Sequence, residues 1–257
     1  MIQKNSPMVQ KLRSGELVVS TKLNITDPII AELAAYAGFD CIWLDMEHIG
    51  VDYKEIQTAM YAAKARGAEV IVRTSRGAYS NLVRPLEMDA TAIMVPHVMN
   101  KADAQQVAYY TKFHPLGRRP IDGGNADGMY CLMGTPDYLR YSNEQKLTII
   151  QIEDIEAYES IEEIASVDGI DMLFFGPADF AHSLGIPCDL SDPRVEEARK
   201  GVAEVARRHG KFAGTVGNTE NLAKLYDMGY QLVNIGADVA GLGIYYQELK
   251  NQIEKVR

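Results

Sequence analysis

Short apolar runs alternate with longer segments of helical periodicity along the whole chain. Most of these runs are continuously apolar, which is typical of parallel strands that are covered on both faces. The pattern predicts eight strands, at Leu17–Leu23, Phe39–Leu44, Glu69–Arg73, Ala92–Pro96, Thr148–Glu153, Met172–Phe175, Phe212–Val216 and Leu232–Gly236.

The segments between the predicted strands carry the signals that begin and end helices. Asp27 precedes Pro28, which favours an N-cap followed by proline in the first turn, and this helical pattern ends at Gly38. Glycine separates a helical segment from the next strand at four further positions, Gly67, Gly169, Gly210 and Gly229.

Eight strand–helix units in a chain of 257 residues predict an α/β fold of one domain, a (β/α)₈ TIM barrel over residues 1–257. A doubly wound open sheet is the alternative. It predicts a glycine-rich turn after the first strand, but residues 24–28 contain no glycine.

One connection is longer than the others, the segment 110–146 between the fourth and fifth predicted strands. Its part from His114 to Tyr130 is rich in glycine and proline. Because long barrel loops are commonly functional, we expect this insert to lie next to the active site.

The composition narrows the class of protein. Hydrophobic residues make up 47% and charged residues 24% of the chain, as in ordinary globular proteins. The net charge is −9 and no basic run is present, so we expect no nucleic-acid partner. The three cysteines are far apart, which predicts no disulfide framework or zinc site and favours a reducing compartment. Neither a signal-peptide core nor a membrane-spanning run is apparent, so we expect a cytoplasmic protein without a membrane partner.

The carboxyl ends of the predicted strands collect acidic residues, one arginine and one histidine, and barrel active sites form at those ends. Glu153 and Asp179 are the best pair of metal ligands, since two carboxylates suit a hard ion such as Mg²⁺ or Mn²⁺. The alternative is that Glu153 pairs with a base and Asp179 caps the next helix.

Two further strand-end residues could act on a substrate. His48 could be a general base, held by a nearby carboxylate, or an ordinary surface histidine. Arg73 could hold a carboxylate or an enolate, or form a salt bridge to Asp45 or Glu47. Backbone N–H groups after Gly176 open a predicted helix and could bind a substrate carboxylate.

Other titratable residues are weaker candidates. Lys22 is the one plausible Schiff-base lysine, although the fifth strand offers acids and no lysine. His97 follows the end of the fourth strand and could line the pocket, whereas His114 and His182 favour structural roles.

Taken together, these strand-end motifs resemble the HpcH/HpaI aldolase family over nearly the whole chain, from about Gly15 to about Leu249. The motifs are Gly38-Phe39-Asp40, Asp45-Met46-Glu47-His48, Val72-Arg73, Gln151-Ile152-Glu153, Gly176-Pro177-Ala178-Asp179-Phe180 and Ser183-Leu184-Gly185.

The resemblance implies a barrel of the phosphoenolpyruvate/pyruvate type, assembled as a hexamer built from dimers that exchange the last helix. It also implies a class II aldolase, a carbon–carbon lyase that requires Mg²⁺, Mn²⁺ or Co²⁺. Such an enzyme cleaves or forms a 2-oxo acid through a pyruvate enolate, with an aldehyde as the second small molecule. The expected substrate is a 4-hydroxy-2-oxo acid or a 2-keto-3-deoxy sugar acid.

By the same resemblance, each site residue acquires a role. Glu153 and Asp179 hold the metal, His48 handles the aldol hydroxyl proton through a water, and Arg73 stabilises the enolate oxygen. Gln151 and the backbone at Ala178-Asp179 contact the bound 2-oxo acid.

The chain departs from the family pattern in three places. Glu87 stands where the family usually has the aspartate that supports the basicity of the histidine. Met46 replaces a usual small residue, and Pro120 replaces the glycine that usually follows the arginine matched by Arg119. Glutamate at position 87 can accept the same hydrogen bond as the aspartate, although its extra methylene changes the reach. The change at Pro120 affects the expected substrate more than the expected chemistry.

Several alternatives stay open. An oxaloacetate decarboxylase or a macrophomate-synthase-like enzyme would use the same enolate without needing a base. A lyase like the citrate lyase β-subunit or malyl-CoA lyase would need basic residues at the rim, where Arg118 and Arg119 are the one cluster. A non-catalytic 2-oxo-acid sensor is disfavoured because every expected catalytic position is filled. The apolar stripe in Gly243–Val256 predicts an oligomer interface, unless it packs on its own barrel.

Overall fold

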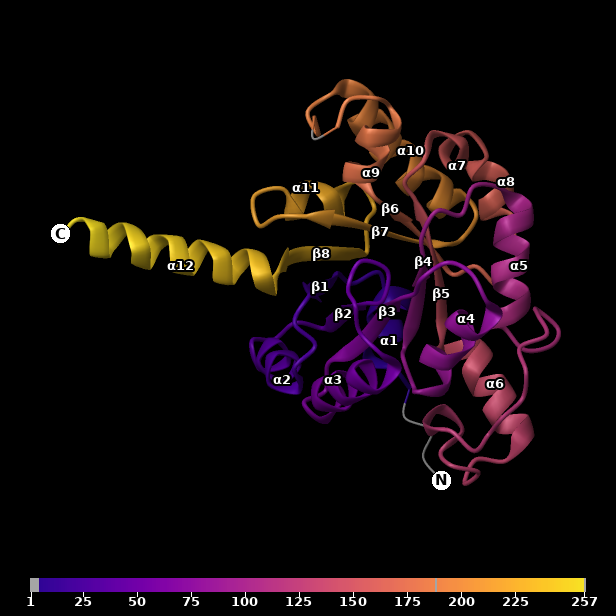
Figure 1. Ribbon diagram of the computed structural model, residues 1–257. Helices are drawn as coiled ribbons and strands as arrows, with labels where there is room; N and C mark the ends of the chain where they lie inside the picture. Colours follow the sequence, from indigo (N-terminus) through magenta and orange to yellow (C-terminus); the bar gives the residue numbers. More distant parts are fainter. Residues whose placement is uncertain (1–4, 188, 257) are drawn as a thin grey trace.

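Eight parallel strands follow chain order around a closed barrel in this computed structural model, which describes residues 5–187 and 189–256 (Figure 1). The strands are β1 (Val18–Leu23), β2 (Cys41–Asp45), β3 (Glu69–Arg73), β4 (Ala92–Val95), β5 (Leu147–Ile152), β6 (Met172–Phe175), β7 (Phe212–Gly217) and β8 (Leu232–Ala237). All eight predicted strands are present, and their ends differ from the prediction by two residues or fewer. The predicted (β/α)₈ barrel is confirmed.

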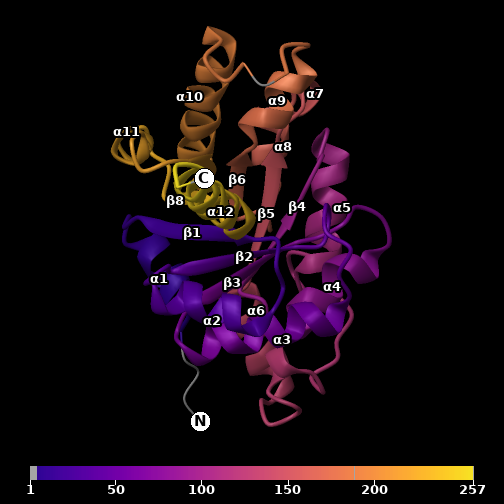
Figure 2. The same ribbon diagram turned by 60° about the vertical axis from the view of Figure 1, so that its left-hand side comes forward.

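Helices cover the outside of the barrel between successive strands, α1 precedes β1 and α12 follows β8 (Figures 1 and 2). They are α1 (Pro7–Arg13), α2 (Pro28–Tyr36), α3 (Tyr53–Ala65), α4 (Tyr79–Glu87), α5 (Lys101–Thr111), the 3₁₀ turn η1 (Ala126–Gly128), α6 (Thr135–Gln145), α7 (Ile155–Glu159), α8 (Ile161–Ala165), α9 (Pro177–Ser183), α10 (Pro193–Arg208), α11 (Leu222–Asp227) and α12 (Asp238–Glu254). As predicted, the Asp27 side chain caps α2 by accepting a hydrogen bond of 2.8 Å from the Ile29 N–H. Gly38 ends that segment with a φ of +94°, a conformation that residues with a Cβ avoid. None of the described helices is long and apolar enough to span a bilayer.

The short helix α1 closes the end of the barrel at which the strands begin, called the base below. Its apolar side chains Met8, Val9 and Leu12 are buried in one cluster with strand-start residues such as Val18 and Cys41. The base is therefore plugged by apolar side chains, and the opposite end, where the strands finish, is the mouth.

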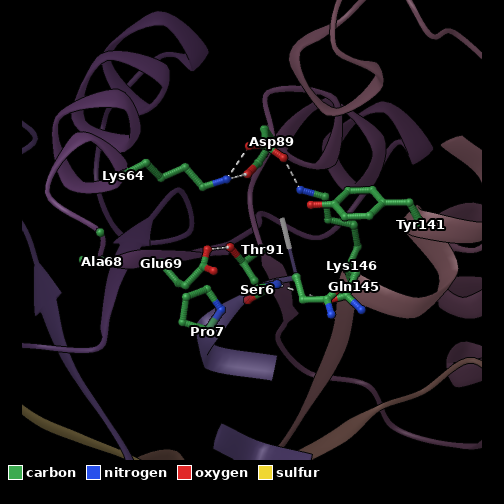
Figure 3. Close-up of a pocket in the computed structure, with 12 residues that line it drawn as sticks. Ser6, Pro7, Lys64, Ala68, Glu69, Asp89, Thr91, Tyr141, Gln145 and Lys146 are labelled. Atoms are coloured by element: carbon green, nitrogen blue, oxygen red, sulfur yellow. Dashed lines mark hydrogen bonds and ion pairs between the residues drawn. The ribbon is translucent and has the colours of Figure 1, made fainter. Parts of the chain in front are cut away.

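A polar cavity of about 200 Å³ lies at the base, beside the start of α1 (Figure 3). There Lys64 of α3 and Lys146, just before β5, both form ion pairs with Asp89. Burial lowers the pKa of Lys64. Burial alone would raise the pKa of Asp89, but the two ammonium groups outweigh it and the pKa is lowered. This cluster ties α3, the turn before β4 and the start of β5 together, a stabilising role typical of a barrel base.

The long connection between α5 and α6, residues 112–134 and called the base loop below, also lies at the base, opposite the mouth of its own chain. That it borders an active site stays a prediction, which only the mouth of another subunit could fulfil. Lys112 donates to the carbonyl of Lys146, before β5, and pairs with Asp171, before β6. The loop is held by its own buried ion pair, Arg119 to Asp127 at 2.6 Å. Because α5 leads from the mouth back to the base, an insertion after it emerges at the base.

The last helix, α12, extends away from the barrel and has no buried residue (Figures 1 and 2). Its predicted apolar stripe is exposed, with exposed fractions of 63% for Ile244, 54% for Tyr245, 37% for Leu249 and 55% for Ile253. The alternative in which this stripe packs on its own barrel is therefore contradicted.

Candidate active site

The mouth of the barrel gathers the polar residues that follow β2 to β6. A buried ion network begins at Asp45, the last residue of β2. Arg73 donates to its two oxygens from Nε at 2.9 Å and from Nη2 at 2.5 Å. Lys22 on β1 approaches the same carboxylate at 2.8 Å. Burial would raise the pKa of Asp45, but these cations outweigh it and hold the pKa well below its usual range.

Arg73 also reaches toward the centre of the mouth. Its Nη1 lies 3.0 Å from Glu47 Oε2, and its guanidinium stacks 4.9 Å from the Trp43 ring centre. The salt bridges to Asp45 and Glu47 that the sequence left as an alternative are thus both present. They fix the guanidinium as a rigid, oriented cation, which does not exclude a contact with an anionic substrate.

Lys22 does not have the surroundings of a Schiff-base lysine. Such a lysine is a neutral amine in apolar surroundings or beside another cation. Lys22 is instead paired with the buried carboxylate of Asp45. The structure gives it a structural role in the network.

Glu153 is the most constrained acid at the mouth. One oxygen accepts a hydrogen bond of 3.0 Å from the His97 backbone N–H, and the other accepts one of 2.7 Å from Gln151 Nε2. Burial first, and then the charges of Asp179 and Glu47, raise the pKa of Glu153 to about 7, although His97 opposes this rise. A buried carboxylate beside other carboxylates is destabilised in its charged form, and a nearby cation would stabilise it.

Gly176, directly after β6, makes room for this carboxylate. A Cβ at this position would lie 2.7 Å from Glu153 Oε2. The next residues lead into α9, where Ala178 and Asp179 are exposed in the first turn. The structure therefore brings Glu153 and Asp179 to the same rim, as predicted.

His48 lies on the loop after β2, with its side chain 60% exposed and its Nε2 3.5 Å from Glu47 Oε2. It is at the mouth and accessible, in agreement with the expected position of a base that acts through water. The nearby acid that could orient it is Glu47.

Glu87 is not close to His48 within one chain. It is the last residue of α4, which runs from the mouth to the base, and it is half-buried. Burial raises its pKa, and the charged groups around it are those of the base loop, Arg119, Asp127 and Asp122. The expected support of His48 by Glu87 cannot occur inside a single subunit.

His97 makes more contacts with the acids of the mouth than the sequence indicated. Its ring Nδ1 lies 2.9 Å from Asp154 Oδ2, and its Nε2 lies 3.8 Å from Glu47 Oε1. Burial would lower its pKa, but Asp154, Glu153 and Glu47 outweigh burial and the pKa is raised. The sequence indicated only that His97 follows a strand that ends in Val95-Pro96. It could not show the backbone conformation that places His97 against these acids.

Two further histidines and Asp238 have positions that the structure defines. His114 is in the base loop, beside Arg118 at 3.1 Å, and His182 is in α9. Asp238 accepts hydrogen bonds of 2.8 Å from the N–H groups of Asn24 and Ile25, so it fixes the loop after β1.

These observations define a class of protein, a parallel (β/α)₈ barrel whose mouth presents carboxylates, a fixed arginine and accessible histidines. The model of the HpcH/HpaI aldolase/citrate lyase family matches residues 23–242, and the chain belongs to this family.

Named relatives cover almost the whole chain. A hydroxypyruvate/pyruvate aldolase of Pseudomonas aeruginosa is 30% identical over 95% of this chain and 91% of its own length. A 2-keto-3-deoxy-L-rhamnonate aldolase of Shigella sonnei is 28% identical over 93% of this chain and 87% of its own. The crystal structure of an HpcH/HpaI aldolase from Desulfitobacterium hafniense matches with a TM-score of 0.90 and 29% identity, over 95% of each chain.

Proposed function

We propose that the protein is an aldolase, a carbon–carbon lyase that cleaves or forms a 2-oxo acid at the mouth of the barrel. The substrate class is a 4-hydroxy-2-oxo acid or a 2-keto-3-deoxy sugar acid, and pyruvate and an aldehyde are the cleavage products. The relatives named as aldolases support this reaction class. The observation that carries it is the buried Glu153, hydrogen-bonded through both oxygens and close to Asp179 and Glu47.

A divalent cation fits this arrangement. Among the described residues, no group of three or more His, Cys, Asp or Glu side chains forms a complete metal site. Mg²⁺ and Mn²⁺ commonly take only one or two protein carboxylates and complete an octahedron with water and substrate oxygens. Glu153 and Asp179 would hold the ion, which would act as a Lewis acid toward the 2-oxo acid.

Gln151 gives an independent sign that a polar partner belongs at the site. Its Nε2 donates to Glu153, which leaves its Oε1 pointing elsewhere. This oxygen is buried, and no donor in the described part of the chain reaches it. A buried acceptor without a partner is costly, so a substrate hydroxyl or a bound water would satisfy it.

Arg73 and His48 would then carry the charge and the proton. Arg73 is fixed by Asp45 and Glu47, so it can stabilise an enolate oxygen without reorganising. His48 is exposed and would take the hydroxyl proton during cleavage, either directly or through one water.

Glu87 could support His48 only across a subunit boundary. The base loop and the end of α4, where Glu87 lies, are at the opposite end of the barrel from His48. We therefore infer a homo-oligomer, a hexamer built from dimers that exchange α12, in which a base of one subunit meets a mouth of another. The exposed apolar stripe of α12 supports the exchange.

An oxaloacetate decarboxylase or macrophomate-synthase-like enzyme is the second candidate function. Decarboxylation would use Arg73 and the ion in the same way and needs no base. A CoA-dependent citrate lyase or malyl-CoA lyase reaction is less consistent with the structure. The arginine expected at the rim, Arg119, is buried in the base loop with 2% of its surface exposed.

Pyruvate release from a panel of 4-hydroxy-2-oxo acids and 2-keto-3-deoxy sugar acids tests the proposal. We expect release to stop after chelation and to return with Mg²⁺, Mn²⁺ or Co²⁺, and to be absent in Glu153→Gln. His48→Ala should lose aldol cleavage while any oxaloacetate decarboxylation persists. Decarboxylation by the wild type without cleavage of any substrate in the panel would favour the second candidate function.

A further inference from the structure

His97 has a backbone conformation that residues with a side chain rarely adopt. Its φ is +50°, in the left-handed region. The other described non-glycine residues with positive φ, Asp89 and Met129–Cys131, lie in turns at the base, whereas His97 directly follows β4 at the mouth. Such a conformation is unfavourable for any residue with a Cβ and persists only where its surroundings fix it.

Three contacts fix His97. Its N–H donates to Glu153 Oε1 at 3.0 Å, and its carbonyl accepts a hydrogen bond from Arg76. Arg76 is itself paired with Asp103 at 2.6 Å. The ring is held by Asp154 at 2.9 Å. Main chain and side chain are therefore clamped from separate elements.

The contact with Glu153 comes from the main chain and not from the imidazole. The dihedral φ of His97 sets how the ring and the carbonyl are placed relative to this N–H. Because Asp154 holds the ring and Arg76 holds the carbonyl, the N–H can stay on Glu153 only while φ remains in the left-handed region. With Gln151 on the other oxygen, Glu153 is held at both oxygens and cannot rotate freely. Such outer contacts orient metal ligands and commonly change metal affinity by about 10- to 100-fold when they are lost.

We propose that His97 is a positioning residue, whose left-handed backbone fixes the Glu153 carboxylate in the orientation that holds the divalent ion. This inference rests on the proposed function, because it requires Glu153 to be a metal ligand. The ring clamps the backbone through Asp154, and the backbone positions the ligand.

Two matched pairs of variants separate the backbone from the ring. His97→Gly and His97→Ala both remove the imidazole and differ by one methyl group, but only glycine adopts positive φ without strain. His97→Asn and His97→Val form a second pair, since asparagine tolerates the left-handed region and a β-branched residue does not. Two quantities are measured for each variant. The Mn²⁺ affinity of chelator-stripped protein is measured by titration calorimetry at a temperature well below the lowest Tm, and Tm is measured separately.

We expect His97→Ala to bind Mn²⁺ at least about 10-fold more weakly than His97→Gly, with His97→Val similarly weaker than His97→Asn. Pairs that differ in Tm but not in Mn²⁺ affinity would show a purely structural turn and overturn the inference. Four variants with equally weakened affinity would assign the effect to the ring and also overturn it. A wild type that binds no Mn²⁺ would instead overturn the proposed function, and the inference with it.

Discussion

Gly176→Ala tests the site geometry directly, because it adds one methyl group against the carboxylate of Glu153, the proposed metal ligand. The new Cβ would lie 2.7 Å from Glu153 Oε2 and 2.9 Å from Glu153 Cβ. Backbone strain is not involved, since Gly176 has a φ of −99° that alanine accepts. Either the methyl group or Glu153 must therefore move.

The size of the effect follows from how tightly Glu153 is held. Overpacking by one methyl group costs about 1–3 kcal/mol. Glu153 is fixed by His97 and Gln151, so a shift of its carboxylate breaks the alignment with a bound ion. If that cost appears in metal binding, Mn²⁺ affinity should fall by between about 5-fold and 140-fold, since 1.4 kcal/mol is a factor of ten.

Gly214→Ala is the matched control. A Cβ at Gly214, on β7, would lie 2.6 Å from Phe174 Cδ2 and 2.9 Å from Met172 Sδ. The overpacking is similar but involves apolar core side chains only. We expect Tm to fall in both variants, whereas Mn²⁺ affinity in Gly214→Ala stays within about twofold of the wild type, as for independent sites.

Titration calorimetry with Mn²⁺ on chelator-stripped protein, followed by pyruvate release at saturating metal, measures both effects. Unchanged Mn²⁺ affinity in Gly176→Ala, together with a lower Tm, would refute the placement of the ion on Glu153. An equal loss of affinity in both variants would show that the site responds to general destabilisation and would refute the local argument.

Four further outcomes are expected. In chelated protein the pKa of Glu153 is raised from 4.5 to about 7, so the folded chain keeps a proton that the unfolded chain has lost between these pH values. The free energy of unfolding should therefore fall by up to about 3 kcal/mol as pH rises through this window, and Glu153→Gln should flatten the urea-measured dependence. Asp89→Asn leaves two ammonium groups at the base without a counter-ion, so urea unfolding should show a loss on the order of 3 kcal/mol with Mn²⁺ affinity unchanged. Co-refolded His48→Ala and Glu87→Ala chains should recover pyruvate release that neither variant shows alone, and no recovery would remove Glu87 from the site. Leu249→Asp should shift light scattering toward smaller species, whereas an unchanged mass would exclude α12 from the interface.

The barrel could be predicted because its signal is local. Parallel strands covered on both faces need continuous apolar residues, and β3 and β6 were predicted to the residue for this reason. The carboxyl ends of parallel barrel strands meet at the mouth. Glu153, Arg73 and His48 could therefore be predicted to lie at the mouth from their positions at or after predicted strand ends.

The features that escaped prediction depend on contacts between distant segments. The base loop looked functional because of its glycines, but its position follows from the direction of α5, and its buried pair of Arg119 and Asp127 is a tertiary contact. The left-handed turn at His97 is enforced by Asp154, Glu153 and Arg76, and none of these is a sequence neighbour. Composition and periodicity do not indicate hydrogen bonds and ion pairs between such distant segments.

Two features of the structure support the proposed homo-oligomer. The helix α12 has 17 residues and no buried side chain, so little tertiary packing stabilises it, and isolated helices of that length are only marginally stable in water. A second apolar stripe is exposed on α2, where Ile29, Leu33 and Tyr36 stand at helical spacing with exposed fractions of 68%, 61% and 64%. Two unpaired apolar stripes on elements that both adjoin β1 are the arrangement that an exchanged helix would cover.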